Sequence, residues 1–173
     1  MMTSVIKILF LMCLPLFIFG QDVKKSSVFG DSLYQVNIKK SKLYGVYIPR
    51  DIDDALSKLM ELTTPEARKP MIRVHEDTIA RKLHFGLGRW MEYNWNFDEG
   101  SRFSHVLREK GLTYTEDMTR FMLIIFHRHV SNKPLNTDKL ITKLVEERMK
   151  KELIERDKHM LIHQETRKIE KKN

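Results

Sequence analysis

Residues 115–129 read TEDMTRFMLIIFHRH and carry the clearest helical pattern in the chain. Apolar side chains recur three or four positions apart, as expected for a helix that packs one face into a core. The residues on this face are Met118, Phe121, Met122, Ile125, Phe126 and His129. His129 continues the face, so we expect it to be packed and hydrogen-bonded. Asn132-Lys133-Pro134 predicts the end of the helix.

Helical signals also dominate the preceding residues, from Ile48 onward, and no segment there alternates like a strand. The signals are capping residues, an early proline and a terminal glycine. The expected elements are a helix capped by Asp51, a second capped by Thr64 and shortened by Pro70, a third over Asp77–Asn94, and a fourth over Ser101–Lys110 with Gly111 at its end. Gly86 and Gly88 predict either a close approach of a neighbouring helix or a kink.

A long helical pattern starts at Thr137-Asp138 and becomes strongly charged from Glu146 onward, since residues 146–173 hold 9 basic and 7 acidic residues. Glu146/Lys150, Glu147/Lys151 and Glu152/Arg156 have the spacing of helical ion pairs. This pattern favours a solvated C-terminal helix.

The lead-in over residues 21–46 is polar, with alternating stretches at Leu33–Ile38 and Leu43–Ile48 that could form a strand pair. We expect a flexible lead-in with at most a short hairpin. The predicted fold is therefore all-α: a lead-in over 21–46, a small multi-helix domain over 47–135, and an extended charged helix over 136–173.

The first 20 residues, MMTSVIKILFLMCLPLFIFG, have the features of a signal peptide. Their apolar run from Ile8 to Phe19 is shorter than the ~20 residues that span a membrane. We expect cleavage near Gly20/Gln21 and export to the periplasm or the exterior, with no stable membrane span afterwards. An uncleaved anchor and a lipoprotein acylated at Cys13 are the alternatives.

The composition narrows the function classes further. The single cysteine lies in the predicted signal peptide, so thiol catalysis and disulfides are excluded for the mature chain. The net charge is +8, but residues 47–145 hold 16 basic and 14 acidic residues, and the excess lies on the flanks. We therefore expect no nucleic-acid binding, and only weak attraction of the basic ends to anionic surfaces.

Aromatic residues mark the expected site, because 9 of the 13 that follow residue 20 lie within residues 85–126. Such rings belong either to a core or to a binding surface. Trp95 and Phe97 lie beyond the expected helix end, and we expect them to be partly exposed. Arg102 could pair with a carboxylate ligand, or with Glu99 or Asp117. The predicted binding residues are Arg89, Trp90, Asn94, Trp95, Phe97 and Arg102.

Several of these motifs resemble an uncharacterised bacterial family known as domain of unknown function DUF6794. The motifs are His84-Phe85-Gly86-Leu87-Gly88-Arg89-Trp90, Asn94-Trp95, Gly100-Ser101-Arg102, Glu116-Asp117-Met118 and His127-Arg128-His129. The resemblance covers about Ile48 to Leu135. It implies a small helical bacterial domain and no particular reaction or cofactor.

No complete catalytic or metal-binding motif accompanies these residues. His84 and Asp117 are the candidate acid–base residues, with Asp98 or Glu99 as other partners of His84. His159 and His163 have the i,i+4 spacing of a shared metal, but the residues between them lack the glutamate of a metalloprotease motif. We expect neither a cofactor nor a metal.

The sequence thus predicts an exported bacterial protein that is a non-catalytic binding module of the cell envelope, with an unknown envelope protein or ligand as partner. Two alternatives stay open. One is an envelope hydrolase or transferase that uses His84, and the other is a structural assembly protein whose C-terminal helix pairs with another copy.

Overall fold

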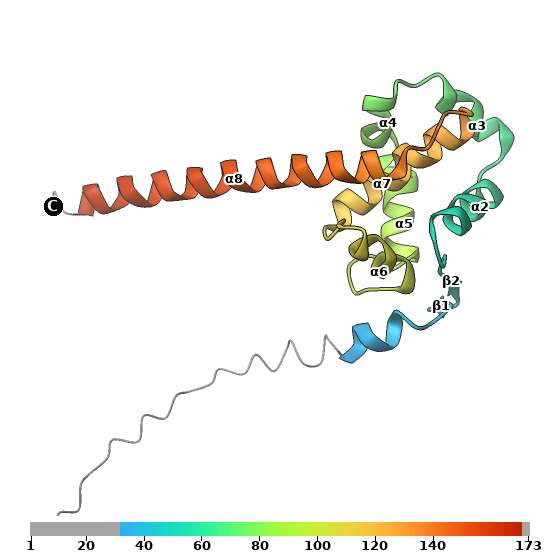
Figure 1. Ribbon diagram of the computed structural model, residues 1–173, viewed down its shortest axis with the longest axis horizontal. Coiled ribbons are helices and arrows are strands. Elements are labelled where there is room, and N and C mark those ends of the chain that lie inside the picture. Colours follow the sequence, from blue (N-terminus) through green and yellow to red (C-terminus); the bar gives the residue numbers. More distant parts are fainter. Residues whose placement is uncertain (1–31, 171–173) are drawn as a thin grey trace, which may run out of the picture.

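The computed structural model describes residues 32–170 of the chain, and the side chains as far as residue 162. The predicted signal peptide, its cleavage point and residues 21–31 of the lead-in lie outside the described residues. Within the described part the fold is helical except for one small hairpin, as the all-α prediction required (Figure 1).

The hairpin precedes all the labelled helices. Its antiparallel strands are β1 (Lys42–Leu43) and β2 (Val46–Tyr47), and Leu43 lies opposite Val46. The following elements are α2 (Ile52–Leu62), α3 (Pro65–Ile72), α4 (Glu76–Leu83), the π-helical turn η1 (His84–Gly88), α5 (Arg89–Asn94), α6 (Arg102–Glu109), α7 (Thr115–Val130) and α8 (Thr137–Glu170).

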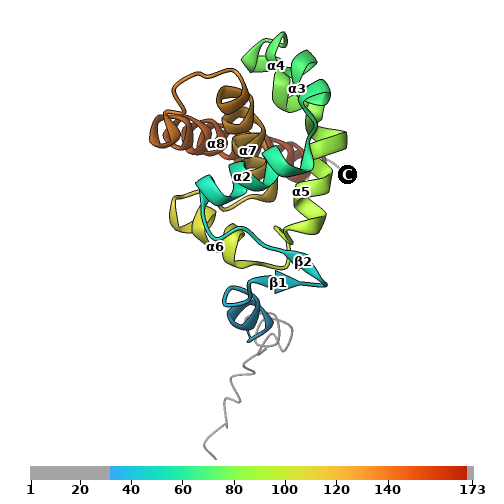
Figure 2. The same cartoon turned by 90° about the vertical axis from the view of Figure 1, so that its right-hand side faces the viewer.

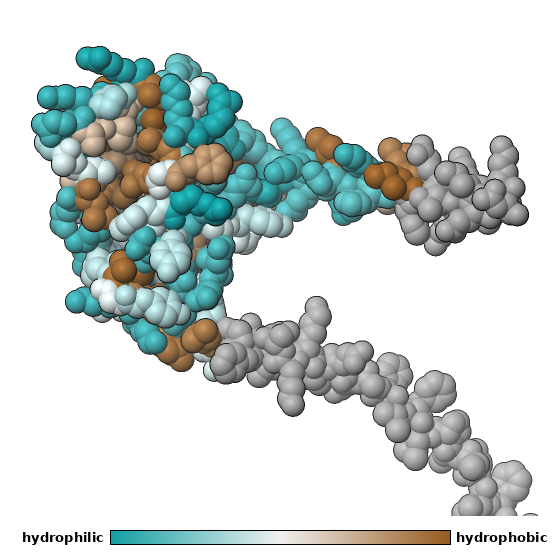
Figure 3. Space-filling view, turned by 180° about the vertical axis from the view of Figure 1, so that it is seen from behind, coloured by the Kyte–Doolittle hydropathy of each residue, from teal (hydrophilic) through white to brown (hydrophobic). Residues whose placement is uncertain are grey.

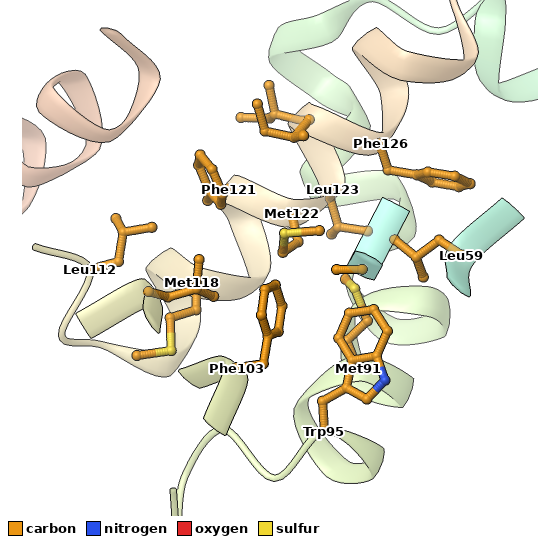
Figure 4. Close-up of a cluster of buried hydrophobic side chains, with 14 of the residues drawn as sticks. Leu59, Met91, Trp95, Phe103, Leu112, Met118, Phe121, Met122, Leu123 and Phe126 are labelled. Atoms are coloured by element: carbon orange, nitrogen blue, oxygen red, sulfur yellow. The ribbon is translucent and has the colours of Figure 1, made fainter. Parts of the chain in front are cut away.

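Helix α7 occupies the centre of the domain. Every residue from 117 to 127 except Arg120 is buried, and α7 contacts α2, α3, α4, η1, α5 and α8. Figure 2 shows α2, α5, α6 and α8 arranged around it. Figure 4 shows Phe121, Met122, Leu123 and Phe126 of α7 facing side chains of the surrounding elements, which include Leu59, Met91 and Phe103. The core is therefore built around one helix that its neighbours surround.

The predicted helix starts are confirmed by their hydrogen bonds. The Asp54 amide donates to the Asp51 carboxylate over 2.8 Å, and the Ala67 amide donates to the Thr64 hydroxyl over 3.2 Å. Pro65 occupies the first position of α3, but the helix continues two residues beyond Pro70. These local signals place the helices before any tertiary contact is considered.

The lead-in differs from the expected strand pair. Residues 32–37 are helical, and the hairpin runs from Lys42 to Tyr47, so apart from Lys42 it lies in the second stretch. Its two-residue loop is Tyr44-Gly45, with φ values of 49° and 81°, and this type of loop lets the chain reverse within that stretch. Leu43 and Ile48 are buried in the core. The hairpin therefore packs on the helical domain, and the expected boundary after residue 46 falls inside β2.

The start of α8 belongs to the domain, whereas its later part projects from it (Figure 1). Leu140, Ile141 and Leu144 are buried, but all residues from 149 to 162 are exposed. Figure 3 shows the projecting part as mainly hydrophilic, with apolar groups toward its far end. Glu147 pairs with Arg120 over 2.6 Å and with Lys143 over 3.9 Å, in place of the predicted Lys151. Within residues 32–170, no helix has the length and apolar character needed to cross a membrane.

The predicted helix over Asp77–Asn94 is interrupted where its two glycines lie. η1 widens the helix by one π-helical turn between α4 and α5. A Cβ atom on Gly88 would lie 3.0 Å from Thr119 Cγ2 and 3.3 Å from Leu123 Cδ1, whereas one on Gly86 would meet nothing within 4 Å. Gly88 thus permits the close approach to α7, and the irregular turn predicted as a kink is present as well.

Because only Gly88 lies in a tight contact, substitutions at Gly88 and Gly86 can be compared as a test and its control. Replacing Gly88 with Val should lower the free energy of unfolding by about 1–3 kcal/mol, because the added methyl groups must displace α5 from α7. Gly86→Ala should leave stability unchanged or raise it. Urea unfolding of both variants measures this, and equal stabilities would contradict the close contact at Gly88.

Candidate functional site

Two of the predicted binding residues lie in the core. Trp95 and Phe97 are fully buried, so the expectation that they are partly exposed is wrong. The chain turns back after α5 and directs both rings under α6, where the Trp95 ring meets the Phe103 ring edge-on at 5.4 Å (Figure 4). Trp90 is partly buried and packs edge-on against Trp95 at 5.8 Å. Trp95 and Phe97 therefore belong to the core beneath the surface and do not lie on the surface itself.

Arg102 has a structural contact where a ligand contact was expected. Its Nε donates to the Ile48 carbonyl oxygen over 2.8 Å, and its guanidinium lies 5.1 Å from the centre of the Tyr47 ring. The predicted pairing of Arg102 with Glu99 or Asp117 is therefore wrong. Arg102 fastens the end of β2 to the start of α6.

Arg89 and Asn94 do reach a surface groove, which lies between the hairpin and the helix α5. The groove has a volume of about 760 Å³. Its lining residues are Leu43, Tyr44, Val46, Arg89, Glu92, Tyr93, Asn94, Asn96, Asp98 and Glu99. We call this the Tyr44–Tyr93 groove, because its two tyrosines are the most exposed aromatic side chains that line it.

The two tyrosines project into solvent: Tyr44 is 80% exposed and Tyr93 is 85% exposed. The Tyr44 hydroxyl donates to Glu99 Oε2 over 3.2 Å. The negative charge of Glu99 raises the pKa of the Tyr44 phenol, and the nearby Tyr93 phenol adds to the effect. The Tyr44 ring therefore stays neutral at physiological pH, next to a carboxylate.

The floor of the groove is tied to the core through Glu92. This side chain is only 9% exposed, and its two oxygens have different partners. Arg89 Nη1 lies 3.0 Å from Glu92 Oε2, and the Thr119 hydroxyl donates to Glu92 Oε1 over 2.9 Å. A buried carboxylate with both oxygens paired holds α5 in a fixed position against α7. Asn94, which also lines the groove, donates its Nδ2 hydrogen to the Trp90 carbonyl over 2.9 Å.

The candidate acid–base residues are not assembled. His84 is half-buried against the Phe85 ring and lines none of the four described cavities. Both oxygens of Asp117 accept hydrogen bonds from Arg148, over 2.7 and 2.8 Å. In the part of the chain that the structure describes, no hydrogen bond joins His84 to a carboxylate. Asp117 thus serves to hold α8 on α7.

The metal candidates are no better placed. His159 is exposed on the projecting part of α8, and the side chain of His163 lies outside the described side chains. Among the residues that are described, no group of three or more His, Cys, Asp or Glu side chains could hold a metal ion.

Sequence reasoning missed Tyr44, Glu92 and Glu99 as groove residues. Tyr44 belongs to the lead-in, and its place beside α5 depends on the hairpin turning at Tyr44-Gly45. A tyrosine before glycine in a two-residue loop is the one local signal that could have marked it, since Asn or Asp is usual there. Tyr93 lies in the aromatic-rich segment over residues 85–126 but is not among the predicted binding residues.

These features define a small all-helical domain with a ligand-sized groove beside an N-terminal hairpin. Residues 48–130 match the model of the family described as Domain of unknown function (DUF6794). The resemblance predicted from the motifs is thereby confirmed. No curated protein and no solved structure gives a significant match to the chain. Tyr93 and the helical wall of the groove lie within the matched residues, and Tyr44 lies before them.

The buried histidine of α7 is His127 and not His129. His127 is fully buried, and among the described residues neither of its ring nitrogens has a hydrogen-bond partner, while His129 is exposed. Burial lowers the pKa of His127 below its ordinary value of 6.5, and the charge of Lys133 lowers it further. The negative charge of Glu76 opposes this lowering of the pKa only in part.

This burial predicts a specific loss of stability in mild acid. Below pH 6.5 the unfolded chain protonates His127 while the folded chain does not, so stability falls until the pH reaches the lowered pKa of the folded state. Chemical unfolding between pH 7.5 and 5 should show a flatter profile for His127→Leu, whereas His129→Gln should keep the wild-type slope. Parallel profiles for wild type and His127→Leu would contradict the prediction.

Proposed function

We propose that this chain is an exported bacterial protein that acts as a non-catalytic binding module of the cell envelope, and that the Tyr44–Tyr93 groove is its binding site. The observation that carries the proposal is the pair of exposed tyrosine rings over a groove whose floor is fixed by the core. Tyrosine is enriched in binding surfaces because it offers a large contact area at a low cost in conformational entropy.

The size and the support of the groove favour this assignment. Its volume of about 760 Å³ lies within the range of ligand sites, which is roughly 300–1,000 Å³. Glu92 fixes its floor through the contact with Thr119, and Arg102 holds its hairpin wall through the contact with Ile48. A wall that is fixed before binding loses little freedom on binding, which favours affinity.

The hydrolase or transferase alternative has less support, because His84 lines none of the described cavities and Asp117 is occupied by Arg148. Assembly through α8 is the second candidate. Met149, Leu153 and Met160 are spaced so that they share one helix face, and all three are exposed. A second copy of α8 could cover this face.

Export is supported by residues 1–20, whose charge and apolar run are typical of a signal peptide. Expression of the full chain in a bacterial host should yield a mature protein in the periplasm or the medium. Mass determination of its N-terminus should identify Gln21 as the first residue. A cytoplasmic product that retains residues 1–20 would contradict export.

Binding at the groove predicts a selective effect of Tyr93. The mature chain, immobilised and exposed to the envelope fraction of its native host, should retain a component that Tyr93→Ala loses by at least tenfold. Phe85→Ala is the matched control, since Phe85 is 83% exposed but does not line the groove. Equal retention by wild type and Tyr93→Ala would overturn the site.

A further inference from the structure

We propose that the Tyr44–Tyr93 groove recognises lysine or arginine side chains, carried by a basic segment of a partner polypeptide. This inference rests on the proposed function and names the chemistry of the same site. Three observations support it: the negative charge of the groove, the uncovered ring faces of its two tyrosines, and the arginines that lie over the other three tyrosines of the chain.

The groove is negatively charged in a chain whose net charge is +8. Its only basic lining residue, Arg89, is paired with Glu92. The carboxylates of Asp98 and Glu99 then remain at the rim, where Thr115 and Tyr44 donate hydrogen bonds to them without neutralising them. A cation is therefore the complementary ligand, and the excess positive charge elsewhere on the chain reduces unspecific attraction of cations.

The five tyrosines of the chain fall into two groups. Tyr34, Tyr47 and Tyr114 each have a basic side chain over the ring, with Arg108, Arg102 and Arg148 at 5.3, 5.1 and 4.5 Å from the ring centres. Among the residues that the structure describes, no basic side chain covers Tyr44 or Tyr93. The two groove tyrosines thus present open faces to a cation from outside.

Arg148 shows which geometry such a cation would find. Its guanidinium lies over the Tyr114 ring and is also bound by the Asp117 and Glu116 carboxylates. In the groove, Tyr44 and Glu99 offer the same two kinds of group, an aromatic ring and a carboxylate, on neighbouring side chains that a hydrogen bond joins. A ring face and a carboxylate that act on one cation reinforce each other.

The size of the groove points to a polypeptide segment as the source of the cation. A volume of about 760 Å³ exceeds the needs of one ammonium group and suits a few residues of peptide. Two separate rings and two rim carboxylates can hold more than one basic side chain. Leu43 and Val46 supply apolar contact for the methylene groups of lysine or arginine.

The position of Tyr44 separates binding from folding. Tyr44 has a φ of 49°, in the left-handed region that Asn and Gly adopt at lower cost, and its exposed ring has little packing to offset that cost. Tyr44→Asn should therefore keep the hairpin and hold or raise the unfolding midpoint while it removes the ring.

The test uses the mature chain and three fluorescent hexapeptides with blocked termini, in which Ser alternates with Lys, with Gln or with Glu. Fluorescence anisotropy at low and at physiological salt should show binding of the Lys peptide, and neither of the other two. Tyr44→Asn and Glu99→Gln should each weaken this binding at least tenfold, with an unfolding midpoint no lower than that of the wild type for Tyr44→Asn. Phe85→Ala should bind as the wild type does.

Three results would overturn the inference. They are equal binding of the Gln and Lys peptides, binding of a neutral oligosaccharide in their place, and full Lys-peptide binding by a folded Tyr44→Asn variant. If Tyr93→Ala still loses its envelope component, only the cation assignment fails and the proposed function stands. If that component is retained as well, the proposed function fails with it.

Discussion

Burial of α7 on nearly every side is the constraint on which the other elements depend. A helix with one apolar face can be covered by a single neighbour, but between residues 117 and 127 only Arg120 of α7 is not buried, so the helix must be surrounded. The short helices α2, α3, α4 and α5 and the turn η1 do this from several directions, and α8 closes the remaining side. None of the short helices would be stable alone in water, so the core around α7 accounts for their stability.

The polar residues of α7 decide which element covers which side. A buried polar group without a partner costs free energy, so Asp117 and Thr119 each favour a neighbour that can pair with them, whereas His127 is buried without such a partner among the described residues. Asp117 pairs with Arg148 of α8, and Thr119 pairs with Glu92 of α5. At the other end of the helix, Arg128 pairs with Glu76 of α4 over 3.0 Å. The apolar residues drive burial, and these pairs fix the arrangement.

The sequence predicted what depends on local chemistry. The caps at Asp51 and Thr64 and the glycine at position 111 act on backbone groups within three or four residues of them. The sequence around them was therefore enough to predict where these helices start and end. The burial of Trp95 and Phe97 depends on the turn after α5, in which Asn96 takes a φ of 52° and redirects the chain under α6. Helical periodicity stops at that turn, so nothing in it indicated the side to which the two rings point.

Only one wall of the groove could be predicted from the sequence, because the other wall depends on a contact between distant residues. Its helical wall, with Arg89 and Asn94, lies in the aromatic segment that the sequence marked as the site. Its other wall is the hairpin, about half the domain away in sequence, and the contact between Tyr44 and Glu99 that joins the walls spans 55 positions. Arg102 belongs to the site in a different role from the one expected: by binding the Ile48 carbonyl it holds the hairpin wall. The groove therefore depends on two arginines that are themselves satisfied by the protein, Arg89 through Glu92 and Arg102 through Ile48, and this leaves its unpaired charge negative.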